Sequence, residues 1–435
     1  MTLVGELELS SFDYTDPELK GERFHTAMNE LAAEGWLAAG PYGYVVLDRE
    51  AGEFFLRTRS AIFPGMKIAE LFDVKDGPLW EEMKRNILHV NGSDHTRLRS
   101  LVNPALTARA VERWRPAMRS FLDELFVPVV DAGTCEFVGA FAKPYPSRTI
   151  ATVMGAPISD APRLHHWSNW IQRQFDAASM MNERAGIEQA VEEFYEYARA
   201  LLAARREDPG DDLISTLLAA TYRPQADDDT LDDGDGRSDA AFGGSRSAAA
   251  RGGGRLAEKL SEEECVNLVL NVLIGGVDTT QSQLAHAVRL LAEHPSQWDA
   301  LVADPSLAGA AVEEALRYEP ITPFTARITT EELTYRDVTF PPDTIVMVCA
   351  FTGNRDGVGA EPDRFDITAV RPKARALTFG AGVHYCLGAN LARLELEEGL
   401  GFLAREMPRL ALDGEPVFES ILGIYGLAEL PIRFG

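Results

Sequence analysis

One cysteine in the sequence has surroundings that suit a metal-binding thiolate. Cys386 lies near the end of the stretch Phe379-Gly-Ala-Gly-Val-His-Tyr-Cys-Leu-Gly388, with two glycines before it and one after it. Glycines permit backbone turns that a Cβ would obstruct, so a planar ligand can lie close to the main chain. Residues 389–405 predict a buried helix, whose N-terminal end would favour a thiolate. For an isolated cysteine, a buried and inert thiol is the alternative.

A second group of chemically active residues lies in a long predicted helix. Ser261 begins it with a capping box, and the helical pattern continues to His294. Residues 275–280 read Gly-Gly-Val-Asp-Thr-Thr, and each glycine costs about 1 kcal/mol relative to alanine in a helix. A threonine there can bond to the carbonyl of the preceding turn and leave a place for water, so Asp278 and Thr279 could form a proton route. The alternative is a glycine pair for helix packing beside a solvent-facing aspartate.

Two pairs of charged or polar side chains occur at helical spacing. His95 and Arg99 fall on one face of a helix that Ser93 can cap, where together they could bind one carboxylate. A solvated basic surface is the alternative. Glu314 and Arg317 lie one turn apart as an ion pair, a kind of contact that usually contributes less than about 1 kcal/mol.

Taken together and in their order along the chain, these motifs resemble those of the cytochrome P-450 family, in its soluble bacterial form. The cysteine stretch matches the haem-thiolate loop F-G-x-G-x-H-x-C-x-G. The other matches are to H-x-x-x-R, to the glycine–acid–threonine motif of the distal helix and to E-x-x-R. The resemblance covers nearly the whole chain.

The resemblance implies a role for each of these residues. Cys386 would be the axial ligand of the haem iron, in the loop that Gly388 completes, and Phe379 would shield the thiolate. Gly276 would make room for oxygen, and Asp278 and Thr279 would deliver protons. The haem propionates would be bound by His95, Arg99, Arg327 and His384. A structural triad supporting the cysteine loop would consist of Glu314, Arg317 and Arg364.

The family also implies a fold and an activity. The fold would be mainly α, with a large helical domain and a small β-rich subdomain in one domain over residues 1–435. With haem b as cofactor, the enzyme would insert one atom of O2 into a small, apolar organic substrate. Electrons would come from a separate ferredoxin- or flavodoxin-type donor, because the chain carries no G-x-G-x-x-G after a strand. The alternatives are oxidative coupling or ring formation at the same iron, or a haem-thiolate sensor without turnover, against which the acid–threonine pair argues.

Composition limits the possible partners and compartments. A hydrophobic content of 46% is ordinary for a globular protein, whereas the net charge of −25 argues against nucleic acid and anionic membranes. Four cysteines without C-x-x-C spacing predict neither zinc nor a disulfide framework and fit a cytoplasmic protein. No stretch approaches the roughly 18 apolar residues of a membrane span. Five arginines form a local basic patch: Arg97, Arg109, Arg113, Arg115 and Arg119. The resemblance places this patch on the thiolate side, facing an acidic redox partner, and a solvated helix surface is the alternative.

The periodicity of the chain predicts its elements. Strands are expected over 44–47, 53–57, 332–335 and 344–348. Helices are expected over 17–35, 111–131, 142–154, 161–178 and 188–205. Residues 63–90 predict a long loop with short helical pieces. Residues 226–254, rich in Asp and then in Gly, Ser and Ala, predict a disordered surface insertion.

Overall fold

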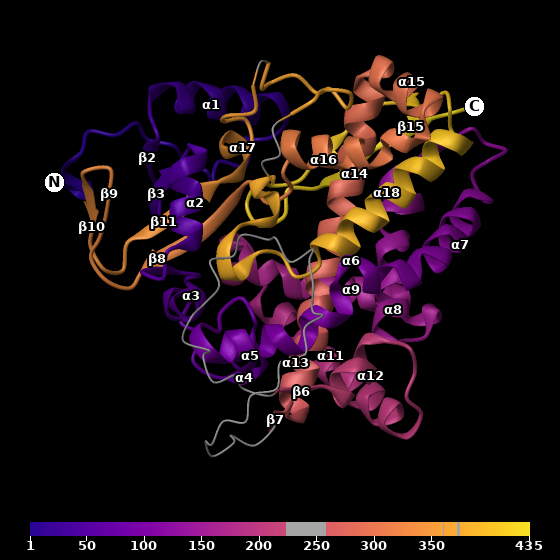
Figure 1. The fold of residues 1–435 in the computed structure, drawn as a ribbon, viewed down its shortest axis with the longest axis horizontal. Coiled ribbons are helices and arrows are strands. Elements are labelled where there is room, and N and C mark those ends of the chain that lie inside the picture. The colour runs from indigo at the N-terminus through magenta and orange to yellow at the C-terminus, as the bar shows by residue number, and fades with distance from the viewer. Residues whose placement is uncertain (223–257, 360, 372–374) are drawn as a thin grey trace, which may run out of the picture.

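Helices make up most of the protein, and the larger strands gather on the side that holds the N-terminus (Figure 1). The structure is a computed structural model that describes residues 1–222, 258–359, 361–371 and 375–435. The predicted insertion at 226–254 lies outside the described residues. The mainly α architecture with a small β-rich part is confirmed.

The helices of the described residues alternate with short loops along most of the chain. In chain order they are α1 Gly21–Glu34, α2 Arg49–Arg57, α3 Gly65–Leu71, α4 Gly77–Arg85, α5 Gly92–Val102, α6 Ala108–Val111, α7 Arg115–Phe126, α8 Pro144–Met154, α9 Ala161–Gln172, α10 Ala177–Asn182, α11 Arg184–Glu207, α12 Leu213–Ala219, α13 Glu262–Gly276, α14 Asp278–Glu293, α15 Pro295–Ala303, α16 Ala308–Tyr318, α17 Ala350–Gly353 and α18 Ala389–Glu406.

The main sheet joins strands from the two ends of the chain. Its order is β2 Leu37–Gly40, β3 Gly43–Val46, β11 Ile345–Cys349, β8 Phe324–Thr329 and β4 Ala61–Ile62. β3 and β11 pair in parallel, and the other neighbours pair antiparallel. Smaller sheets of the described residues are β1 Thr2–Leu3 with β10 Val338–Phe340 and β9 Leu333–Tyr335; β12 Ala411–Leu412 with β15 Pro431–Arg433 and β5 Thr134–Glu136; β13 Val417–Phe418 with β14 Leu427–Glu429; and β6 Thr221–Tyr222 with β7 Glu258–Lys259.

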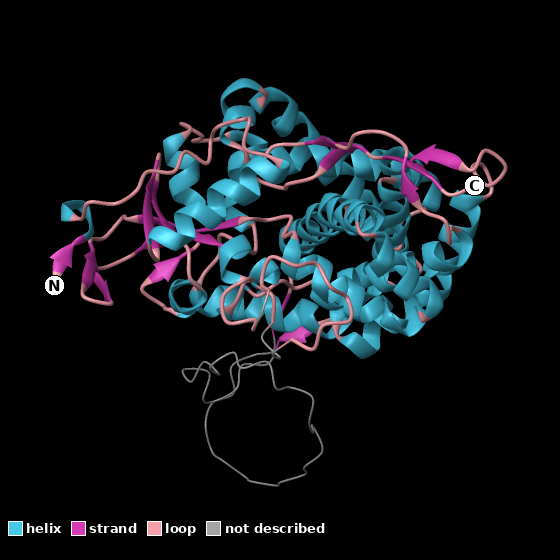
Figure 2. Cartoon of the chain, turned by 90° about the horizontal axis from the view of Figure 1, so that it is seen from above, coloured by secondary structure: helices cyan, strands magenta, loops and turns pink. Residues whose placement is uncertain are grey.

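The long predicted helix crosses the helical part of the molecule as α13 and α14. Its capping box is present, because Ser261 accepts from the backbone of Glu264 and the Glu264 side chain accepts from the backbone of Ser261. At 1.5 Å per residue the two helices span roughly 50 Å. They run vertically in Figure 1 and are seen nearly end-on in Figure 2. The helical run ends at Glu293, as predicted, but it is interrupted at Val277, beside the acid–threonine pair.

One local prediction near the N-terminus differs from the structure. Residues 53–57, expected as a strand, form the end of α2. Asp48 caps this helix by accepting from the backbone N–H of Ala51, and Ala51 and Phe55, four residues apart, are buried on one face. The helical cap therefore prevails over the apolar run that suggested a strand. By contrast, the short helical pieces expected within the loop at 63–90 are present as α3 and α4.

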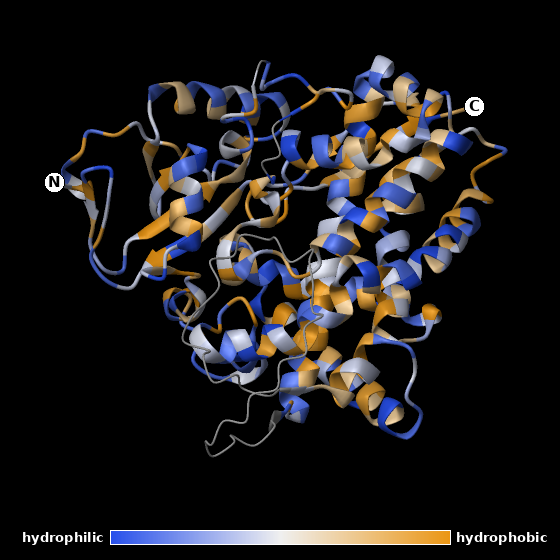
Figure 3. Cartoon of the chain, viewed as in Figure 1, coloured by the Kyte–Doolittle hydropathy of each residue, from blue (hydrophilic) through white to orange (hydrophobic). Residues whose placement is uncertain are grey.

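Apolar packing holds the site elements in place. Along most helices apolar residues alternate with polar ones, as Figure 3 shows, and the apolar faces meet in the interior. The largest core cluster includes side chains of α7, α8, α9, α11, α13, α14 and α18. No helix among the described residues is long and apolar enough to cross a membrane.

Candidate active site

The cysteine loop turns tightly before α18 and presents Cys386 to a cavity. Gly382 has a positive φ of +69°, and a Cβ there would lie 2.5 Å from the Leu56 carbonyl oxygen, so this position requires glycine. The Cys386 N–H donates to the Phe379 carbonyl oxygen at 2.9 Å and closes the turn. Gly388 occupies the N-cap of α18 and lines the same cavity as Cys386.

Opposing influences act on the Cys386 thiol. Burial raises its pKa, whereas the backbone N–H groups of Gly388 and Ala389 and the positive charges of Arg99 and Arg393 lower it. Such donors and cations stabilise a thiolate, and a bound metal cation would add to their effect. The predicted arrangement of Cys386 at the N-terminal end of a buried helix is therefore present.

A cavity of about 1030 Å3 joins the cysteine loop to the interruption between α13 and α14. Cys386 and Phe379 line it together with Gly275, Gly276 and Thr279. Most of the other lining residues are apolar, including Phe63, Phe175, Met180, Phe324 and Ile421. The cavity can hold a flat cofactor and a small organic molecule, since single-ligand pockets are commonly about 300–1000 Å3.

The four predicted propionate contacts converge near the cysteine loop without a carboxylate among the described residues to pair with them. The rings of His95 and His384 lie 4.3 Å apart, and His95 Nε2 and His384 Nδ1 are buried without a hydrogen-bond partner among the described residues. Arg327 is 2% exposed and donates only to the neighbouring Ala326 carbonyl. Arg99 donates to the Tyr385 carbonyl at 2.8 Å.

Burial places these four groups in an unfavourable environment. It lowers the pKa of His95 to about 4, that of His384 to about 3 and that of Arg327 to about 10. With these pKa values the two histidines are neutral and can donate hydrogen bonds, whereas Arg99 and Arg327 keep their charge. Burying a cation without an acidic partner is costly, so a site that keeps Arg327 is suited to an anion. Carboxylates at the edge of a flat cofactor would supply the missing partners, and the residues present therefore fit a haem.

The acid–threonine motif has the local geometry that the sequence predicts for a proton route. Thr279 Oγ1 donates to the Gly275 carbonyl oxygen at 2.5 Å, which diverts that carbonyl from the helix ladder. A Cβ at Gly276 would come within 2.3 Å of Ile150, whereas a Cβ at Gly275 would meet nothing within 4 Å. Gly276 thus permits close packing on α8, and the open space lies at Gly275.

Asp278 points away from solvent and is hydrogen-bonded to a neighbouring helix. It is 6% exposed, and Ser168 of α9 donates a short hydrogen bond to its carboxylate. Burial raises the pKa of Asp278, while the Ser168 bond and the nearby His165 act in the opposite direction. The solvent-facing alternative for this aspartate is therefore wrong. Ser168 was not predicted, because no sequence signal links α9 to this position.

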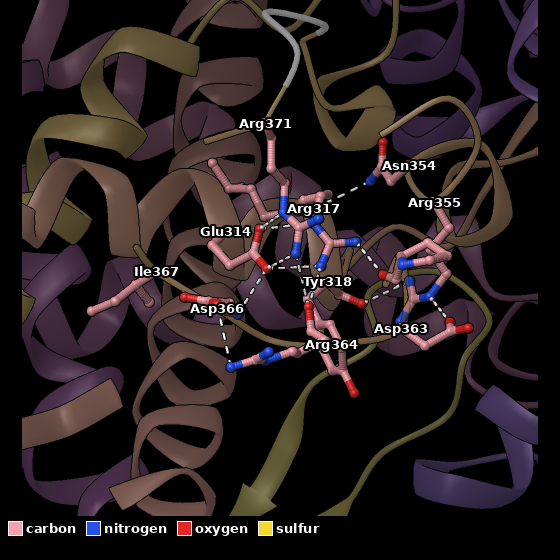
Figure 4. A network of polar contacts seen from close by, with 12 residues as sticks. Glu314, Arg317, Tyr318, Asn354, Arg355, Asp363, Arg364, Asp366, Ile367 and Arg371 are labelled. Carbon is pink, nitrogen blue, oxygen red and sulfur yellow. Dashed lines mark hydrogen bonds and ion pairs between the residues drawn. The ribbon is translucent and has the colours of Figure 1, made fainter. Parts of the chain in front are cut away.

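The predicted triad has a different third member (Figure 4). Arg317 and Arg371 each bind Glu314 through two hydrogen bonds of 2.8 Å. Arg364 instead turns to Asp366 and Glu361 and is 56% exposed, and only its backbone carbonyl accepts from the two arginines. Although burial raises it, the two arginines bring the pKa of Glu314 below its usual value. The assignment of Arg364 is wrong because its side chain has exposed acidic partners of its own.

The triad lies next to the cysteine loop. Thr378, just before Phe379, donates to the Leu316 carbonyl of α16 at 2.6 Å. Tyr385 and Arg393, which the sequence did not single out, also support the loop. Tyr385 Oη accepts from Arg393 at 3.2 Å, and the Arg393 guanidinium lies 4.5 Å from the centre of the Phe379 ring. The position of Arg393 two turns after the cysteine was the available signal.

The expected basic patch is largely neutralised by acidic neighbours. Arg97 pairs with Glu264, and Arg113 pairs with Asp211. Arg115 and Arg119 both bind Glu398, which is 9% exposed. Four of the five arginines thus carry structural ion pairs, so their presence is weak support for a docking surface.

The fold and the site fit a haem protein, and comparison with known proteins gives the family. The sequence matches the Cytochrome P450 family over residues 38–405. It is 31% identical to luteothin monooxygenase of Streptomyces thioluteus over 98% of this chain and 97% of that protein. It is 33% identical to erythromycin C-12 hydroxylase of Saccharopolyspora erythraea over 80% of each chain.

Solved structures of similar proteins share the fold of this chain. CalO2 superposes with a TM-score of 0.83 at 28% identity, covering 98% of this chain and 99% of that one. CxnD, a cytochrome P450 for C–S bond formation in chuangxinmycin biosynthesis, superposes with a TM-score of 0.80 at 26% identity, covering 98% of each chain. The chain belongs to the cytochrome P450 family of haem-dependent monooxygenases.

Proposed function

We propose that Cys386 ligates the iron of a haem b in the central cavity and that a small, mainly apolar organic substrate is oxygenated there. The observation that carries this is the convergence of three features on one cavity: the cysteine loop, the acid–threonine interruption, and buried cationic groups that lack carboxylate partners. When bound, a haem with a thiolate ligand supplies oxygen activation and O–O cleavage.

The residues of the chain would each do a defined part of the work. His95, Arg99, Arg327 and His384 would bind the propionates and fix the cofactor's orientation. Thr279 would keep the Gly275 carbonyl turned aside and hold a water in the open space, and Asp278 would pass protons to that water. The apolar lining would exclude bulk water and position the substrate. A separate ferredoxin- or flavodoxin-type protein would supply electrons.

The test of this proposal is the spectrum of the reduced, CO-treated protein. Cys386→Ser should abolish the red-shifted Soret band that thiolate ligation produces, because serine does not provide the sulfur ligand. Cys135→Ser is the matched control, since Cys135 is the other partly exposed free cysteine. If the band persists in Cys386→Ser, Cys386 is not the iron ligand.

Oxidative coupling is the second candidate function. The likeness to CxnD, which forms a C–S bond, favours it. The mass of the product decides between the two: insertion adds one oxygen atom, whereas intramolecular coupling removes two hydrogens without adding oxygen. A product without added oxygen from every converted substrate would replace the first proposal with the second.

A further inference from the structure

Arg393 is held rigidly beside the cysteine loop by three different contacts. Its Nε donates to Glu313 Oε1 at 2.5 Å, and its Nη1 donates to Tyr385 Oη at 3.2 Å. The guanidinium also lies 4.5 Å from the centre of the Phe379 ring, a cation–π distance. Its side chain is 26% exposed, and it is not among the residues that line the cavity. A role in substrate binding is therefore not supported for this arginine.

Tyr385, the residue before Cys386, connects two guanidinium groups to the loop. Its carbonyl oxygen accepts from Arg99, and its hydroxyl accepts from Arg393. Both guanidinium groups are thus held at the residue next to Cys386, where a positive charge favours negative charge on the sulfur. Arg99 also belongs to the proposed propionate contacts. Arg393 has no such second task, which leaves its charge near the sulfur without a role in the proposed function.

Charge near the sulfur bears on the electron affinity of the site. Reduction adds one negative charge to the iron and its ligands, and a fixed positive charge in a poorly solvated position favours the reduced form. Glu313 opposes this effect, because it places a negative charge on the outer side of the same guanidinium and is 49% exposed. The pair thus presents two charges of opposite sign, both able to act on the iron and its ligands.

We propose that the Arg393–Glu313 pair sets the reduction potential of the iron bound by Cys386: Arg393 raises the potential, and Glu313 limits the rise. This inference rests on the proposed ligation by Cys386. Arg393 acts through the thiolate and touches neither substrate nor oxygen, so it is a positioning residue.

The experiment measures the midpoint potential of the substrate-free holoenzyme by spectroelectrochemical titration. Arg393→Gln should lower the potential, and Glu313→Gln should raise it, because Tyr385 and Phe379 still hold the unneutralised guanidinium in place. Arg393→Lys keeps the charge and should stay closer to the parent than Arg393→Gln. These opposite directions would not arise from a general loosening of the loop.

Arg405→Gln is the matched control. Arg405 lies on the same helix, 5.1 Å from the centre of the Phe402 ring and paired with Glu406 at 2.7 Å, so it shares two of the three kinds of contact that hold Arg393. It is about 24 Å from the start of α18 at 1.5 Å per residue. Its removal should leave the potential unchanged.

The CO spectrum of each variant separates a failure of the proposed Cys386 ligation from a failure of the inference about the reduction potential. If the thiolate band is present but Arg393→Gln and Glu313→Gln leave the potential unchanged or move it in the same direction, the inference is wrong while Cys386 ligation stands. If the parent lacks the thiolate band, the proposed function fails first. Should Arg393→Gln lose its haem, the shifts in Glu313→Gln and Arg393→Lys decide the matter: a raised potential in the first and a near-parental one in the second support the inference, and any other result overturns it.

Discussion

Two side chains near the cysteine loop lack acidic partners and so indicate an anionic ligand. Arg327 is 2% exposed and His384 is partly exposed, and neither has an acidic partner among the described residues. The other buried arginines among the described residues pair with acids, as Arg289 does with Glu319. The contrast separates arginines that stabilise the fold from Arg327, whose charge an anionic ligand would pair.

Thr279 offers the sharpest test of the proton route. Thr279→Ala removes the hydroxyl that donates to the Gly275 carbonyl. We expect the variant to fold, bind haem and consume reductant, but to release hydrogen peroxide in place of part of its product, because the water that delivers protons is no longer held. Asp278→Asn should instead slow turnover as a whole, because losing a positioned proton-transfer group typically costs about 10²–10⁴ in rate.

The measurement requires product, peroxide and consumed reductant from one reaction with a converted substrate and a surrogate electron donor. Thr280→Ala is the control, since Thr280 is the adjacent threonine and also lines the cavity. If Thr279→Ala forms product from reductant as efficiently as the parent, the proton-delivery role is wrong and the oxidative-coupling alternative is favoured.

At the scale of elements, the sequence predicted those features that depend on local patterns. The capping box, the end of the long helix and the start of α18 follow from residues close together in the chain. The third member of the triad could not be predicted in this way. Arg364 and Arg371 lie on one loop, and only the path of that loop decides which of them reaches Glu314. Nor could the sequence show that Ser168 meets Asp278, since that contact depends on how α9 crosses the long helix.

The corrected triad predicts unequal effects for two nearby arginines. Arg371→Met should destabilise the protein by roughly 1–3 kcal/mol, because it removes two charged hydrogen bonds from the buried Glu314. Arg364→Met should change the free energy of unfolding by less than about 0.5 kcal/mol, since its ion pairs are exposed. Urea unfolding of both holoenzymes, with haem content measured in parallel, provides the comparison. The reverse order of effects would restore Arg364 to the triad.

The contact of α4 with the helical core predicts a pH dependence. Glu82 is fully buried, and burial raises its pKa to about 7, against the hydrogen bond from Asn86. Its Oε2 and the Oε1 of Gln174 are both acceptors without a hydrogen-bond partner among the described residues. A proton on Glu82 would let it donate, and the folded state therefore binds this proton more tightly than the unfolded state does.

The direction in which stability changes with pH follows from the linkage between proton binding and folding. A carboxyl whose pKa is raised by folding stabilises the protein below its unfolded pKa, and this contribution is lost as the pH rises to about 7. Glu82→Gln imitates the protonated form, so its stability relative to the parent should increase over this range and then level off. Unfolding midpoints of the two proteins across this range test the idea. A constant difference between them would show that Glu82 does not change its protonation on unfolding.

On the scale of the whole molecule, a buried ionic cluster fastens the N-terminal β-rich part to the long helix. His25 of α1 lies 3.0 Å from both carboxylate oxygens of Glu319, and Arg289 of α14 binds the same carboxylate at 2.6 Å. Glu319 itself is completely buried, at the end of α16. The two parts that enclose the cavity are thus joined by buried contacts to one carboxylate as well as by apolar packing.

The tract at 226–254 should be dispensable for this assembly. The described segments that flank it end side by side, because β6 and β7 pair antiparallel through Thr221 with Lys259 and Tyr222 with Glu258. A short connection can therefore span the gap. The free energy of closing a loop changes by only about 0.6 kcal/mol for each doubling of its length, so length alone contributes little.

Replacing residues 226–254 with a short Gly/Ser linker should leave haem content, the CO spectrum and the unfolding temperature of the holoenzyme nearly unchanged. A variant with the same tract in scrambled order keeps its length and composition and serves as the control. If the linker variant melts several degrees lower while the scrambled variant does not, the length or charge of the tract matters. If both variants melt lower, its sequence contributes specific contacts, and the expectation of a dispensable insertion is wrong.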